Sequence, residues 1–266
     1  MRWTSGLNRK LAKNALCHPE RSLPRFWAAD VVEGSAAVFH RLLTAICILA
    51  LAATRAAHAQ APPAPPAPQA RFVVVIDAAH GGDDAGAHLA DGKLEKAATL
   101  TLSVRLRSLL TARGIQVVTT READQSADST KRAEMANHAA AQACISLHAA
   151  DTGSGVHLFV SSLAPRQPTH FEPWKTAQAA YVTRSLALAG ALNSALSRDG
   201  SAVTLGRTAL PGVDSMTCPA VAIELAPQRD SNKKITAEPG DPGYQAQIAA
   251  TLANALLEWR TEARQP

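Results

Sequence analysis

Two histidines and two glutamates of this chain have the residue types and the sequence positions that zinc-dependent hydrolysis of a substrate requires. His80 and His148 each follow an apolar segment, Glu95 stands early in a helix-like segment, and Glu224 ends an apolar run. A catalytic zinc ion takes three protein ligands and keeps one position open for water. We predict that His80, Glu95 and His148 bind one Zn²⁺ ion, which leaves Glu224 as the catalytic base.

Each of these residues alone has an ordinary explanation. A histidine after a strand is commonly a surface or capping residue, and a histidine within an apolar segment is commonly a satisfied core residue. A glutamate in the first turn of a helix is favoured there by the helix dipole in any case. The prediction therefore depends on the set of residues and on the elements that would bring them together.

The elements that position these residues are predicted to alternate between strands and helices. Buried or half-buried strands are expected at residues 72–76, 115–119, 143–147, 156–160 and 220–225, and helices at 94–113, 131–141, 174–196 and 245–259. Such alternation is typical of an α/β fold, a three-layer sandwich with a mostly parallel central sheet of about six strands and helices on both faces. Chemistry in such sheets gathers past the carboxyl ends of the strands.

The N-terminal part of the chain differs in composition from the rest. Residues 42–53 are apolar, Arg41 precedes them, and Ala57-His58-Ala59 follows with small residues at alternate positions. This run is too short for a permanent anchor, which takes about 20 apolar residues. We predict a leader over 1–59 with a signal peptide cleaved after Ala59. A retained signal anchor is the alternative.

A spacer and one domain are expected after the leader. Residues 60–70 are rich in proline and alanine, which predicts an extended, semi-rigid segment, and residues 71–266 would form the catalytic domain. The net charge of +5 lies in the leader, because residues 60–266 hold 19 basic and 19 acidic side chains. The folded part thus has no charge excess to attract a nucleic acid, and none is expected as a partner.

Cys144 and Cys218 are the two cysteines of the predicted domain, and each lies beside an apolar segment. They could pair in an oxidising compartment. Two cysteines show no spacing framework, however, so buried free thiols are the expectation.

Several motifs in a fixed order carry a resemblance to a known family. They are residues 76–87 (Ile-Asp-Ala-Ala-His-Gly-Gly-Asp-Asp-Ala-Gly-Ala), 94–96 (Leu-Glu-Lys), Thr120-Arg121, Asp124, Arg132, Ala136-Asn137, 145–149 (Ile-Ser-Leu-His-Ala) and 219–224 (Pro-Ala-Val-Ala-Ile-Glu). Over about residues 71–260 the chain resembles the zinc-dependent N-acetylmuramoyl-L-alanine amidases of the amidase 3 type. The resemblance implies that His80, Glu95 and His148 bind zinc and that Glu224 is the catalytic glutamate.

The resemblance also implies a substrate, and it weakens at certain positions. The family cleaves the amide between N-acetylmuramic acid and L-alanine of peptidoglycan. Glycine usually stands where this chain has Ala79, asparagine is frequent at Ala150, and residues 225–230 depart from the family's usual glycine-aromatic stretch. These departures concern contacts around the rim of the site and leave the proposed ligands untouched.

Other polar residues receive secondary interpretations. Arg121 and Arg132 are expected to brace loops, and Asp77 to contact a ligand imidazole or cap the turn. The remaining histidines of the domain, His88, His138, His157 and His170, are read as incidental. The segment between His148 and Glu224 has too little spare length for a helix that would block the zinc, so we expect an open site.

Two other functions fit the same residues. One is a non-catalytic peptidoglycan-binding module, which would have no need of Glu224. The other is a zinc peptidase or deacetylase that acts on another amide, because the metal chemistry is shared. We expect an exported monomer, periplasmic or associated with the cell wall, without a stable membrane anchor after cleavage. The sequence identifies no activating protein partner.

Overall fold

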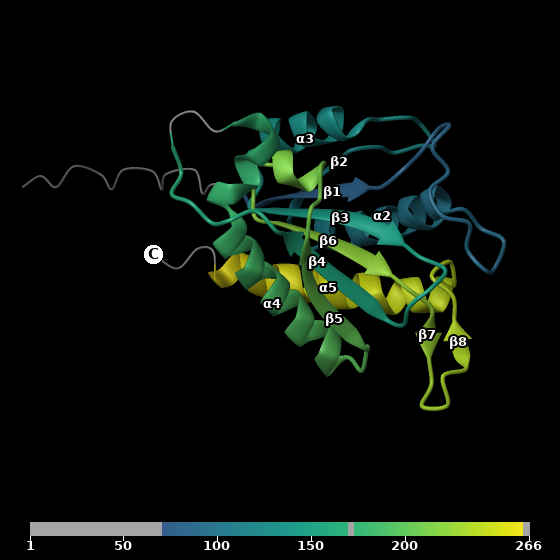
Figure 1. Cartoon of the computed structure of the whole chain (residues 1–266). Helices are drawn as coiled ribbons and strands as arrows, with labels where there is room; N and C mark the ends of the chain where they lie inside the picture. The colour runs from purple at the N-terminus through teal and green to yellow at the C-terminus, as the bar shows by residue number, and fades with distance from the viewer. Residues whose placement is uncertain (1–70, 170–172, 263–266) are drawn as a thin grey trace, which may run out of the picture. The chain divides into compact units, whose positions relative to one another are not determined.

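A six-stranded sheet forms the centre of the computed structural model, which describes residues 71–169 and 173–262. The strands are β1 (Val73–Ala78), β2 (Gln116–Thr119), β3 (Ala143–Ala149), β4 (Val156–Ser161), β5 (Val203–Thr208) and β6 (Ala220–Leu225). Their order in the sheet is β2-β1-β3-β6-β4-β5 (Figure 1). β2, β1, β3 and β6 are parallel, whereas β4 runs antiparallel to β6 and parallel to β5. The predicted α/β fold with a mostly parallel sheet is confirmed.

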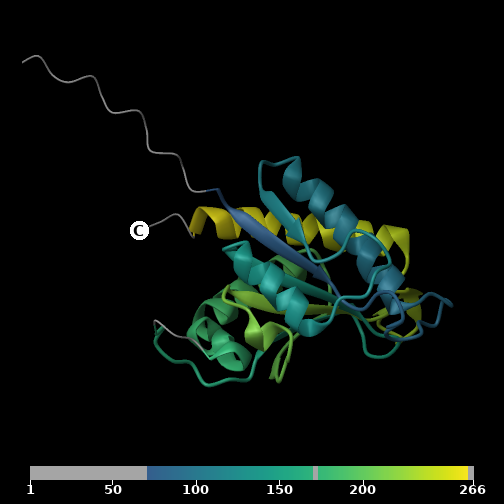
Figure 2. The same cartoon turned by 90° about the horizontal axis from the view of Figure 1, so that it is seen from above.

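Helices cover the two faces of this sheet unequally. The helical elements are α2 (Glu95–Thr111), α3 (Ser129–His138), η1 (Trp174–Ala180), α4 (Val182–Arg198), η2 (Val213–Ser215) and α5 (Pro242–Glu262). Val74 and Ile76 of β1 pack in one large apolar cluster with α2, α4 and α5, whereas Val73 and Val75 pack with α3 and η2. We call these the three-helix face and the α3 face; Figure 2 shows α5 and α3 on opposite sides of β1.

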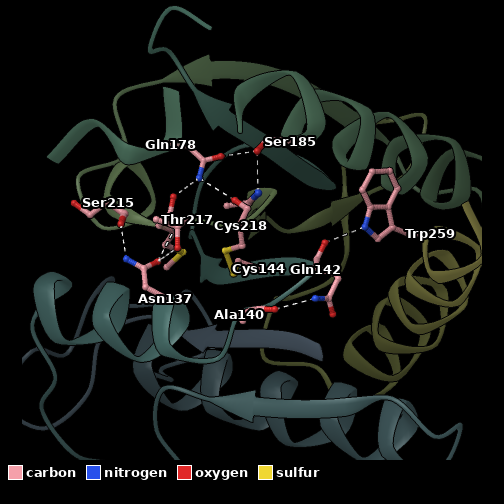
Figure 3. The surroundings of a disulfide bond; sticks show 12 residues. Asn137, Ala140, Gln142, Cys144, Gln178, Ser185, Ser215, Thr217, Cys218 and Trp259 are labelled. Atoms are coloured by element: carbon pink, nitrogen blue, oxygen red, sulfur yellow. Dashed lines mark hydrogen bonds between the residues drawn. A yellow bond between two sulfur atoms is a disulfide. The ribbon is translucent and has the colours of Figure 1, made fainter. Parts of the chain in front are cut away.

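A disulfide bond crosses the α3 face. Cys144 on β3 is bonded to Cys218, which lies two residues before β6 (Figure 3). The parallel register places Cys144 opposite Ala220, so the pairing of the strands brings the two cysteines together although they are 74 residues apart. The expectation of free thiols was therefore wrong.

Polar side chains fix the chain segment that leads into β6. Asn137 of α3 donates to the carbonyl of Ser215 and accepts from the backbone N–H of Thr217. On the other side of the disulfide, Gln178 donates to the carbonyls of Met216 and Cys218 (Figure 3). These bonds satisfy backbone groups that no strand pairs, and they fix the start of the strand that ends in Glu224.

Three elements differ from the sequence-based expectation. The helix expected over 174–196 is broken, because Thr176 has non-helical backbone angles and η1 precedes α4. β5 was not foreseen, since its residues are half-buried or exposed at the edge of the sheet. A small hairpin of β7 (Gln228–Arg229) and β8 (Ile235–Ala237) also follows β6.

The predicted leader and spacer lie outside the described residues, so their interpretation stays a prediction. Among the helices that the structure describes, none has the length and apolar character needed to span a bilayer.

Candidate metal centre and active site

The predicted ligands come from three separate elements at one end of the sheet. His80 follows β1, Glu95 is the first residue of α2, and His148 lies near the carboxyl end of β3. His80 has a left-handed backbone with a φ of 62°, which is uncommon for a residue other than glycine. The Arg132 guanidinium donates to the carbonyl of His80 at 2.6 Å and helps to hold this conformation.

The side chains of these three residues converge. Nε2 of His80 lies 3.2 Å from Oε2 of Glu95, and Nδ1 of His148 lies 3.0 Å from Oε1 of the same carboxylate. The two imidazole rings meet edge to face with their centroids 5.6 Å apart. One potential ligand atom from each residue lies within 4.8 Å of the others, so the three could hold one metal ion.

The electrostatics of the cluster favour a cation. Burial raises the pKa of Glu95, but hydrogen bonds with His148 and His80 and from the backbone N–H groups of Ala87 and Ala149 outweigh it and hold the pKa below its ordinary value. The hydrogen bond to Glu95 raises the pKa of His80 against the opposing effect of burial. A carboxylate that stays ionised between two imidazoles attracts positive charge, whether a proton or a metal ion.

The donor set and its packing fit zinc in particular. Two imidazoles and one carboxylate form a ligand set found in catalytic zinc sites. Gly86 packs so closely that a Cβ atom there would lie 2.7 Å from Oε2 of Glu95 and 2.7 Å from the His80 ring. Its φ of 65° is also one that glycine adopts without strain. The backbone at Gly86 therefore passes close to the side chains of two predicted ligands, Glu95 and His80.

A carboxylate that the sequence interpretation missed contacts the first predicted ligand, His80. Oδ2 of Asp84 lies 2.8 Å from Nδ1 of His80, four residues earlier. A partner on one ring nitrogen fixes the tautomer and leaves the other nitrogen as the ligand atom, here the Nε2 that faces Glu95. The spacing of His80 and Asp84 within the Gly-rich turn was the available signal.

The predicted ligand His148 is linked to Asp77 through a hydroxyl group. Asp77 does not contact a ligand imidazole; it accepts hydrogen bonds from Thr120, Ser146 and Arg132. The Ser146 hydroxyl lies between Asp77 and Nε2 of His148, at 2.8 and 3.5 Å. The predicted role of Asp77 is therefore indirect.

Two buried arginines brace the turn that carries His80, as expected from the sequence. The Arg121 side chain donates to the carbonyls of Ala78 and Ala79 and reaches Lys96 at the start of α2. Arg132 donates to Asp77 and to the carbonyls of Ala78 and His80. Both guanidinium groups are occupied by the protein itself, so their role is structural.

Glu224 lies on β6 directly beside the second predicted ligand, His148. The β3–β6 register pairs it with His148, and the β4–β6 register pairs it on the other side with His157. Nδ1 of His157 lies 2.9 Å from Oε1 of Glu224. Reading His157 as incidental was therefore wrong, and the cause was the direction of β4, which the sequence did not specify.

A cavity of about 360 Å³ opens beside the ligand cluster. Its lining includes His80, His148, the polar side chains of Arg132 and Ser146, and residues 210–213. Among the described residues between His148 and Glu224, no histidine, cysteine or acidic residue joins the predicted ligand cluster. Residues 170–172 of this segment lie outside the described residues, so the open site stays a prediction.

The fold and the site together define a class of protein, an α/β fold in which a His-Glu-His triad that could hold a metal ion lies near the carboxyl ends of β1 and β3. The family model of the N-acetylmuramoyl-L-alanine amidases, Amidase_3, matches residues 74–258. The chain belongs to this family and is an N-acetylmuramoyl-L-alanine amidase.

Individual relatives agree with this assignment. The germination-specific N-acetylmuramoyl-L-alanine amidase of Bacillus subtilis is 26% identical over 215 residues, which cover 73% of this chain and 82% of the relative. The amidase AmiC2 of Nostoc punctiforme is 25% identical, with a TM-score of 0.55 over 71% of this chain and 97% of that one. The amidase Ami1 of Mycobacterium smegmatis has the same fold at 20% identity, with a TM-score of 0.58 over 72% and 97% of the two chains.

Proposed function

We propose that this chain is an exported, zinc-dependent amidase that cuts the bond between N-acetylmuramic acid and L-alanine during remodelling of the cell wall or separation of cells. The observation that carries the proposal is the convergence of His80, Glu95 and His148 beside Glu224. His80, Glu95 and His148 would hold one zinc ion. When bound, the ion supplies Lewis acidity, which acidifies water and polarises the amide carbonyl.

The protein groups around the ion have separate tasks in this mechanism. Glu224 takes a proton from the attacking water and passes it to the leaving amine of L-alanine. Asp84 holds His80 in one tautomer, and Ser146 links His148 to the buried Asp77. The cavity beside the cluster gives the substrate room next to both histidines. The products are a glycan strand without its peptide and a free stem peptide.

Export is supported by two observations. Residues 42–53 have the composition of a signal-peptide core, and the domain contains the Cys144–Cys218 disulfide. Disulfides persist in oxidising compartments and are rare in the cytosol. A periplasmic or wall-associated location gives the enzyme both its substrate and the conditions for this bond.

Purified muropeptides and mass spectrometry test the reaction. We expect the zinc-loaded protein to release stem peptides that begin with L-alanine, and Glu224→Ala to reduce the rate by about 10²- to 10⁴-fold while zinc stays bound. Glu134→Ala, which removes an exposed glutamate on α3, is the matched control. Cleavage of a different bond, binding without cleavage, or an active Glu224→Ala variant would each contradict the proposal.

A further inference from the structure

Three neighbouring strands form a row of polar residues on the α3 face. The registers pair His148 on β3 with Glu224 on β6, and Glu224 with His157 on β4. Residues paired in this way point to the same face of a sheet. Glu224 therefore stands between a predicted metal ligand and a second histidine that has no part in the metal cluster.

The histidine is in hydrogen-bond contact with the carboxylate. Nδ1 of His157 lies 2.9 Å from Oε1 of Glu224, and the two side chains are 19% and 32% exposed. Among the hydrogen bonds of the described residues, the Glu224 carboxylate takes part in this one alone. An ionised carboxylate only accepts hydrogen bonds, so Nδ1 is the donor in this contact.

The backbone and a neighbouring ring keep His157 in place. Gly153 approaches so closely that a Cβ atom there would lie 2.6 Å from Cε1 of His157. Phe159, two residues along β4, meets the imidazole edge to face with centroids 6.2 Å apart. Because the imidazole is confined on both sides, its Nδ1 presents a fixed donor to Glu224.

We propose that His157 is the positioning residue of the catalytic glutamate. Its Nδ1–H donates to Oε1 of Glu224, restricts the rotation of a partly exposed carboxylate, and leaves Oε2 to exchange the proton with water and the leaving amine. The inference rests on the proposed role of Glu224. Misplacing a reacting group by about 1 Å can cost about 100-fold in rate, so a group that fixes this carboxylate affects turnover more than substrate binding.

Two substitutions separate hydrogen bonding from packing. His157→Leu fills much of the same space without a donor, whereas His157→Asn is smaller but places an amide nitrogen near the position of Nδ1. If His157 only fills space, leucine is the better replacement. If it positions Glu224, asparagine is the better one.

The first readout is the kcat and KM of the zinc-loaded protein and its variants with purified muropeptides. We expect His157→Leu to lower kcat by about 10- to 100-fold with KM and zinc content unchanged, and His157→Asn to recover most of the loss. His138→Ala, which removes an exposed histidine at the end of α3, should match the wild type. Equal activity of His157→Leu and wild type, or a loss with asparagine as large as with leucine, would overturn the proposal.

Crystal structures of the same variants give a readout that does not depend on activity. The Glu224 side chain should occupy one conformation in the wild type and in His157→Asn, and more than one in His157→Leu. If this pattern holds in a protein that leaves muropeptides intact, the proposed function and the catalytic role of Glu224 fail, while the ordering of the Glu224 carboxylate by His157 stands. If cleavage needs Glu224 while a single Glu224 conformation persists in His157→Leu, the positioning role alone fails.

Discussion

The two faces of the sheet are built in different ways. On the three-helix face, large side chains of α2, α4 and α5, such as Leu106, Leu192 and Leu256, pack on β1, β3, β4 and β6 in one extensive cluster. On the α3 face the apolar cluster is small, and the helix contributes mainly Ala133 and Ala136. Burial of apolar surface therefore stabilises the first face far more than the second.

Covalent and polar links take the place of packing on the α3 face. The Cys144–Cys218 bond, the Asp77–Arg132 ion pair and the Asn137 hydrogen bonds all lie there. Such links occupy little volume, and the cavity on this face is lined by Ser146 and His148 of β3 and by Ala222 of β6. On this thinly covered face the side chains of His148 and Glu224 are partly exposed, while the opposite face maintains the fold.

The largest expected effect is the loss of the metal centre without loss of the fold. Glu95→Gln removes the negative charge between His80 and His148, and we expect zinc binding to disappear and the amidase rate to fall more than about 10³-fold. Because Glu95 is buried at the start of α2 and its carboxylate accepts hydrogen bonds from the backbone N–H groups of Ala87 and Ala149, the metal-free variant should be about 1–3 kcal/mol less stable than the metal-free wild type but should still fold.

Zinc content, muropeptide cleavage and urea unfolding of the metal-free proteins check this prediction. Glu134→Gln, at an exposed position of α3, is the control for the loss of one carboxylate. Collapse of the fold in Glu95→Gln would show that the site and the fold are not separable in this way.

The second prediction concerns the buried ion pair on the α3 face. NH1 of Arg132 lies 2.7 Å from Asp77, and each side chain is 8% exposed. Arg132→Met leaves a buried carboxylate without its charged partner, which should lower the free energy of unfolding by about 3–5 kcal/mol. Arg198→Met removes an arginine from a pair with Glu258 in which the side chains are 64% and 60% exposed, and it should cost less than about 1 kcal/mol. Equal costs in urea titrations would contradict the contrast.

The parts of the molecule that follow from local patterns could be predicted from the sequence. The apolar run over 72–76 and the helical period ending before Gly114 gave β1 and α2 to within a few residues. His80 and His148 converge because β1 and β3 are parallel neighbours, so that the carboxyl ends of both strands meet at one edge of the sheet. Their roles in binding zinc stay a prediction, as does that of Glu224.

The parts that depend on strand direction and distant pairing could not be predicted. β4 has alternating burial in either direction, so nothing local indicated that it runs antiparallel and brings His157 to Glu224. The disulfide needs the β3–β6 register before the two cysteines become neighbours. β5 lacks a buried stripe because it is an edge strand with half-exposed residues.

The third prediction tests the disulfide as a substitute for packing. Cys144→Ala with Cys218→Ala should lower the free energy of unfolding by about 2–4 kcal/mol, since the bond closes a long loop in the unfolded chain. Urea titrations with and without a thiol reductant measure the effect. The wild type should lose stability on reduction, and the double variant should not respond. A wild type that is unaffected by full reduction would mean that the small cluster suffices on this face.

The smallest effects come from a matched pair of adjacent valines. Val74 and Val75 of β1 are both fully buried, but Val74 faces the three-helix cluster and Val75 the α3 cluster. Each change to alanine removes two methyl groups and should cost about 1–3 kcal/mol. We expect Val74→Ala to cost more, because α3 is a single short helix that can settle toward the sheet more easily than three packed helices.

The coupling of each valine to the disulfide sharpens this comparison. Val75 is paired with Cys144 in the β1–β3 register, so its side chain shares the α3 face with the disulfide, whereas the Val74 side chain lies on the other face. Double-mutant cycles with the cysteine-free variant should give an interaction energy above about 0.5 kcal/mol for Val75→Ala and less for Val74→Ala. Equal coupling for both valines would mean that the two faces respond as one core, and that the disulfide stabilises the whole sheet rather than the face that it crosses.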